Sequence, residues 1–156
     1  MLYIIISLLG CLFGFILARY TKEELRKGVF YFRLLEILII LILILVILLS
    51  SDFNLLLFIM GILIGLMLRF EYLYFGFVLV FPFSNDVLFL LSALIFIYGL
   101  PYGSLIYYNK KIKYLIWSVI LFFIPFVNYF FDYNLISFAT GGLFVFFIAK
   151  IRSLLL

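Results

Sequence analysis

The longest apolar run in this chain is the feature that most constrains its fold. Residues Leu35 to Leu49 are all apolar except Glu36, and runs of similar character recur along the sequence. None of them shows the alternation of apolar and polar residues that marks a strand of a membrane barrel. Continuous apolar stretches are instead typical of helices that cross a lipid bilayer. We therefore predict an all-α, polytopic membrane protein.

The composition supports this prediction and indicates lipid, not nucleic acid, as the partner of the chain. Hydrophobic residues make up 70% of the 156 residues and charged residues 12%, against roughly half and about a quarter in soluble proteins. So few charged side chains cannot cover the apolar interior of a soluble fold, so we expect the lipid bilayer of the cell membrane as the surroundings. The net charge of +4 is explained by loop residues, and we predict no nucleic-acid partner.

Metal and cofactor chemistry has little support in the sequence. The chain contains no His and one Cys, whereas zinc and haem sites need clustered His and Cys ligands. No phosphate-binding loop, nucleophile motif or pair of catalytic carboxylates is present. We predict no cofactor, no metal site and no catalytic residue, and we expect that the protein is not an enzyme.

Short polar turns divide the chain into seven apolar segments, with no separate soluble domain within residues 1–156. We predict helices at Leu2–Leu17, Leu34–Leu49, Leu55–Leu68, Tyr72–Phe83, Val87–Tyr108, Tyr114–Phe131 and Leu135–Ala149.

The third and fourth segments, 55–68 and 72–83, are short for full crossings. Fourteen helical residues extend about 21 Å, against a hydrocarbon core of about 30 Å. Two arrangements are open: seven crossings, or five crossings plus one re-entrant hairpin. The hairpin would place Arg69 and Glu71 near mid-membrane, where each charge costs at least about 2.5 kcal/mol unless it is paired.

Charged loop residues predict the orientation. In the seven-helix arrangement all 11 Lys and Arg residues fall on one side, which places the N-terminus outside and the C-terminus in the cytoplasm. The opposite loops carry Asp52, Asp86 and Asp132. The re-entrant arrangement keeps the same sidedness.

Small residues predict where helices pack closely. Gly10 and Gly14, and likewise Gly61 and Gly65, are four residues apart and share a helix face, which lets two backbones approach in lipid. These faces are candidates for packing within the chain or against another subunit.

Helix interruptions are the candidates for a transport pathway. Pro101 lacks the backbone N–H that a helix interior uses, and Pro125 does too. Thr140, Gly141 and Gly142 loosen the middle of the last helix. A pathway is expected where this last segment faces Pro125 and residues 99–103.

Glu36 is the carboxylate expected nearest to lipid depth. Arg33, one helical turn earlier in the sequence, is the predicted ion-pair partner.

Two functions follow from these features. The favoured one is a small membrane-embedded subunit or structural partner of a larger complex, with other membrane subunits or further copies of the chain as partners. The alternative is a small transporter or channel for an ion or small solute.

Overall fold

The computed structural model describes residues 2–68, 70–130 and 135–155, and this part of the chain is helical without strands. The helices are α1 (Leu2–Tyr20), α2 (Lys22–Ser50), α3 (Leu55–Met67), α4 (Glu71–Val80), α5 (Asn85–Tyr108), α6 (Ile112–Phe123), the 3-10 helix η1 (Ile124–Phe130) and α7 (Ile136–Leu155). Within the described residues the predicted all-α class is confirmed, and the seven α-helices fit the predicted count.

Two boundaries differ from the prediction for local reasons. The sixth segment stops being α-helical at Phe123 and continues as η1, because Pro125 cannot donate a backbone hydrogen bond. The last helix extends beyond Ala149 to Leu155, so Lys150 and Arg152 lie within it. The predicted end of the sixth helix at Phe131 and the loop residue Asp132 lie outside the described residues.

The helix α5 is not broken at Pro101. We expected a kink or break near it, but α5 runs as one helix from Asn85 to Tyr108 with Pro101 inside. The neighbouring helices enclose this part of α5, since Tyr98, Gly99, Pro101 and Gly103 are all buried.

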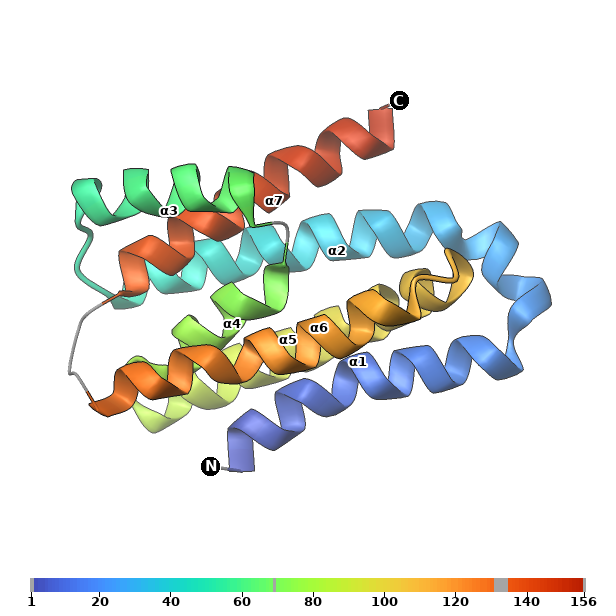
Figure 1. Ribbon diagram of the computed structural model, residues 1–156, viewed down its shortest axis with the longest axis horizontal. Helices are drawn as coiled ribbons and strands as arrows, with labels where there is room; N and C mark the ends of the chain where they lie inside the picture. The colour runs from blue at the N-terminus through green and yellow to red at the C-terminus, as the bar shows by residue number, and fades with distance from the viewer. Residues whose placement is uncertain (1, 69, 131–134, 156) are drawn as a thin grey trace.

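Four stretches are long and apolar enough to cross a membrane: Tyr3–Tyr20, Lys27–Ser50, Asn85–Tyr108 and Ile136–Leu155. The shorter apolar stretches are Leu55–Met67, Glu71–Val80 and Ile112–Val127. The helices α6 and η1 pack mainly against α4, and α3 packs against α7. Figure 1 shows that α3 and α4 are both much shorter than α2. The loops 51–54 and 81–84 lie at one end of the bundle, and residues 109–111 lie at the other.

Two helix pairs make the closest contacts, α1 with α5 and α3 with α7. Each pair brings glycines of both partners together: Gly10 and Gly14 of α1 lie against α5, and Gly61 and Gly65 of α3 lie against α7. The helix α2 packs against both α5 and α7 and so connects the two pairs.

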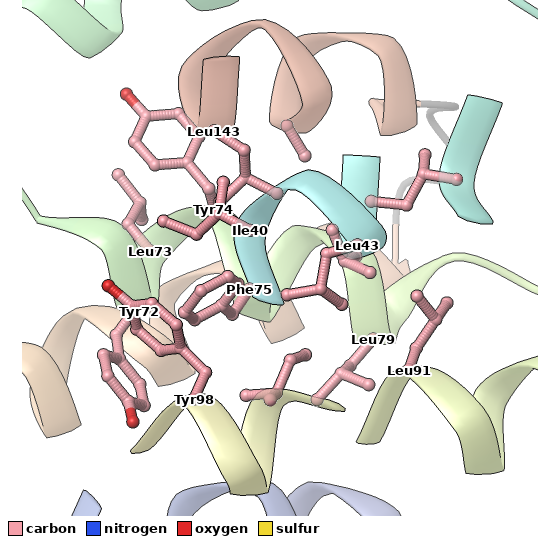
Figure 2. Packing of buried hydrophobic residues seen from close by; sticks show 14 of the residues in the cluster. Ile40, Leu43, Tyr72, Leu73, Tyr74, Phe75, Leu79, Leu91, Tyr98 and Leu143 are labelled. Atoms are coloured by element: carbon pink, nitrogen blue, oxygen red, sulfur yellow. The ribbon is translucent and has the colours of Figure 1, made fainter. Parts of the chain in front are cut away.

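The helix α4 fills the space between these pairs. Eight of its ten residues are buried, including Tyr72, Tyr74, Phe75 and Glu71. Figure 2 shows the tyrosines Tyr72 and Tyr98 on one side of the core and Leu43, Leu79 and Leu91 on the other. The core is therefore apolar toward one end of α4 and carries hydroxyl groups toward the other.

Candidate functional site

The amine of Lys150 on α7 lies between two buried carboxylates. Its Nζ atom is 2.7 Å from Oε2 of Glu36 on α2 and 3.1 Å from Oε1 of Glu71 on α4. The side chains of Glu36, Glu71 and Lys150 are only 4%, 10% and 16% exposed. We call these three residues the ionic site. It joins three helices through charges that are largely removed from solvent.

Two tyrosines of α5 complete the surroundings of the amine. The Nζ atom of Lys150 lies 5.4 Å from the ring centroid of Tyr98 and 5.6 Å from that of Tyr102, within the range of cation–π attraction. The Tyr98 hydroxyl donates to Oε2 of Glu71. The Tyr102 hydroxyl lies 3.0 Å from the hydroxyl of Ser118 on α6, which extends the polar cluster to a fifth helix.

The two carboxylates are not equivalent. Glu71 is contacted at both oxygens, by Lys150 and by Tyr98. Glu36 accepts from Lys150 at Oε2, while its Oε1 atom is buried and has no hydrogen-bond partner among the described residues. A buried acceptor without a partner costs free energy, so this oxygen is a position where a proton or a donor would be stabilised.

A groove of about 570 Å³ reaches the ionic site from the surface. Glu71 is among its lining residues, and Arg152 is a second charged one. The apolar walls come from α3 and α7: Ile62, Gly65, Leu66, Phe144, Val145, Phe146, Ile148 and Ala149.

The groove exists because α3 is short. Gly65 allows α3 to lie close to Gly142 of α7, but α3 ends at Met67, which is 83% exposed. The C-terminal part of α7 continues beyond that point without α3 beside it (Figure 1). Lys150 and Arg152 belong to this uncovered part, so one faces the buried carboxylates and the other lines the groove.

The predicted packing glycines all lie at helix contacts. A Cβ atom at Gly10 or Gly14 would overlap the backbone of Phe96 or Leu100 of α5, and one at Gly61 would overlap Phe138 of α7. The faces proposed for another subunit are thus occupied within the chain.

The predicted pathway residues pack against several different helices. Gly99 and Gly103 pack against α1, Pro125 lies beside Gly76 of α4, and Gly141 lies against α3. The remaining pathway candidates pack in the same way, since Gly142 lies beside Tyr74 and Thr140 donates to the Ile136 carbonyl of its own helix. Of the predicted residues, Gly65 alone lines the groove.

The partner predicted for Glu36 is wrong. Arg33 donates to the backbone carbonyl of Ser153 at 3.1 Å, while Glu36 pairs with Lys150. The site residues that the sequence did not indicate are Lys150, Tyr98 and Tyr102. A usable signal was present, because an unbalanced carboxylate in an apolar helix requires a cation from another helix.

The chain matches no protein-family model, and searches of curated proteins and of solved structures found no relative. The arrangement of its own side chains is therefore the basis for a functional proposal.

Proposed function

We propose that this protein is a small multi-pass membrane transporter that moves an ion or small solute past the ionic site. The observation that carries the proposal is the buried group of Glu36, Glu71 and Lys150 beside an open groove. Ionisable groups are expensive at membrane depth, and they are retained there mainly where they serve ion or substrate movement.

Membrane insertion is supported by the surface of the bundle as well as by the four long apolar helices. Large apolar side chains are exposed on α2, α3, α5 and α6, among them Leu38, Ile42, Leu56, Leu63, Phe89 and Ile120. Exposed apolar surface on several helices is unfavourable in water and favourable in lipid.

The lengths of α3 and α4 favour five crossings with a re-entrant hairpin over seven crossings. With 13 and 10 residues, the two helices extend about 20 and 15 Å, which is less than a bilayer core. Glu71, at the start of α4, also pairs with Lys150. This places Glu71 inside the bundle and not in a loop at its end. In this arrangement α1 and α2 would cross with the N-terminus outside, and the groove would open toward the cytoplasmic half.

The hairpin supports transport for a second reason. Non-helical backbone at membrane depth is tolerated where protein or a water-filled cavity surrounds it, and many transporters place their binding sites at such interruptions. Here the start of α4 adjoins both the groove and the ionic site. Of the three residues of the ionic site, Glu71 is therefore the one that a solute in the groove would meet first.

A second candidate function is that of a subunit in a larger membrane complex. It is favoured by the outer face of α3, where Leu55, Leu56, Ile59 and Leu63 are exposed. Lipid would cover this face equally well, so the ionic site makes the transporter the better supported proposal.

Flux through reconstituted protein tests the proposal. Liposomes containing the purified chain are loaded with ion-sensitive dyes, and flux of protons and alkali cations is compared between the wild type and Glu71→Gln. Gln keeps the shape of Glu71 and one of its two hydrogen-bond acceptors, and it removes the charge beside the groove. We expect flux to fall at least about tenfold, which corresponds to about 1.4 kcal/mol in the barrier.

The matched control is Asp86→Asn, which removes an exposed carboxylate in the first turn of α5. It should leave flux unchanged. Equal flux in wild type and Glu71→Gln, or no flux above empty liposomes for any ion tested, would contradict the proposal. In that event a fixed partner found after gentle detergent extraction would support the subunit function.

A further inference from the structure

We propose that the ionic site binds a single proton and that Glu36 is the residue that takes it. The inference rests on the proposed transport function, since it names the species that this site handles. Its evidence is the count of charges in the site, the number of donors on each carboxylate and their burial.

The ionic site holds one more negative than positive charge when all three groups are ionised. Two carboxylates share one amine, at 2.7 and 3.1 Å from Nζ. Such an excess is costly where solvent is largely excluded, because an uncompensated buried charge loses its hydration without gaining a partner. Uptake of one proton makes the site neutral.

Hydrogen bonding decides which carboxylate takes the proton. Glu71 receives one donor at each oxygen, from Lys150 and Tyr98, and these donors stabilise its ionised form. Glu36 receives a donor at Oε2 alone, and its buried Oε1 has no partner among the described residues. A proton at Oε1 would remove the negative charge where it is least compensated.

Among the described residues, Lys150 is the one cation that forms an ion pair with Glu36 or Glu71. The other ionisable groups around the site among the described residues are Cys11 on α1, Arg33 on α2, Tyr72 on α4, Tyr98 and Tyr102 on α5, and Arg152 on α7. Arg69 lies outside the described residues. The helix α6 contributes the hydroxyl of Ser118. Of the two described arginines, Arg33 donates to the neutral Ser153 carbonyl, so it keeps its positive charge and acts on Glu36 without forming an ion pair with it. Arg152 is exposed at the groove.

The proton changes the balance between the two ion pairs without any covalent rearrangement. It comes from water that reaches the groove, binds Oε1 of Glu36 and leaves Glu71 as the only negative partner of Lys150. The amine then shifts toward Glu71, and loss of the proton restores the shared position. Since Lys150 lies on α7, Glu36 on α2 and Glu71 on α4, protonation alters how strongly α7 is held to α2.

Infrared difference spectroscopy tests the inference without relying on transport. The detergent-purified protein is titrated across neutral pH, and the carboxylic-acid C=O stretching band is separated from the carboxylate bands. We expect one buried carboxylic acid to form in the wild type. Glu36→Gln leaves one carboxylate opposite Lys150, so the band should be lost.

Two further variants make the test specific. Glu71→Gln also leaves one carboxylate opposite one amine, so it should lose the band although Glu36 is intact. The control Asp86→Asn should retain the band. A band that persists in Glu36→Gln, or a wild type without any such band across the titration, would overturn the inference.

The infrared test and the liposome flux test can fail independently. Protonation without flux in liposomes would contradict transport and leave the proton site standing. Flux without the band would overturn the proton site and leave transport standing.

Discussion

The helix pairs α1–α5 and α3–α7 share the same glycine motif but differ in how far the two helices stay in contact. In both, a Gly-x-x-x-Gly face lies against a helix that carries two glycines: Gly99 and Gly103 in α5, Gly141 and Gly142 in α7. The helix α1 accompanies α5 over most of its length, whereas α3 has 13 residues against the 20 of α7.

Because α3 is shorter than α7, the two helix pairs differ in what lies beyond their contact. Along α1–α5 the contact is closed, and the Ser104 hydroxyl donates to the Gly14 carbonyl across it at 2.9 Å. Along α3–α7 the contact ends at Met67, and the rest of α7 supplies Lys150 to the ionic site and Arg152 to the groove. The same glycine motif therefore builds a sealed pair in one place and supports an open site in the other.

The largest expected effect comes from removing the cation of the open pair. Lys150→Met leaves Glu36 and Glu71 facing each other without a positive partner, and breaking a buried ion pair in this way costs about 3–5 kcal/mol. We expect a matching fall in the free energy of unfolding, measured by denaturant titration in mixed micelles. Lys113→Met, which removes an exposed lysine from α6, is the control and should change stability little. An equal effect of both substitutions would show that the ionic site does not stabilise the bundle.

A smaller effect is expected from adding one methyl group to the sealed pair. In Gly14→Ala the new Cβ atom would lie 2.8 Å from the Cα atom of Leu100, so the two backbones must separate. Overpacking of this kind costs about 1–3 kcal/mol. The matched control is Gly28→Ala in α2, where the nearest atom is 3.5 Å away on the Phe32 ring. That change should stabilise the protein by about 0.5–1 kcal/mol, because Ala is the better helix former.

The smallest effect is expected in the pair that borders the groove. In Gly65→Ala the new Cβ atom would lie 3.2 Å from the Gly142 Cα atom and 3.2 Å from Val145, which requires a shift of a few tenths of an ångström. We expect a loss below about 1 kcal/mol, at the lower limit of overpacking, and less than for Gly14→Ala under the same conditions. If Gly65→Ala lowered the free energy of unfolding more than Gly14→Ala does, the α3–α7 contact would be the tighter of the two, contrary to this comparison.

Local sequence features predicted the helices well and their contacts poorly. Apolar runs and polar turns depend on neighbouring residues, so segments such as Val87–Tyr108 were found within a few residues of α5. The third and fourth helices were also located, and their shortness already raised the re-entrant alternative. A break at Pro101 does not occur, and the surrounding helices enclose this part of α5.

The ionic site was missed because its members are far apart in sequence. Arg33 was the nearest cation to Glu36, and periodicity alone could not show that Lys150, 114 positions away, would replace it. The predicted end of the last helix at Ala149 also left Lys150 in a terminal tail. Pairing between distant helices depends on how whole helix faces fit, and a single sequence carries little information on that fit.

The position of Lys150 late in the sequence has a consequence for the synthesis of the protein. The ribosome makes Glu36 and Glu71 before Lys150, so both carboxylates are present in the nascent chain before their amine. In the proposed membrane setting, their insertion stays unfavourable until α7 emerges and supplies the positive charge. The ionic site is therefore expected to form only after α7 has been synthesised and inserted.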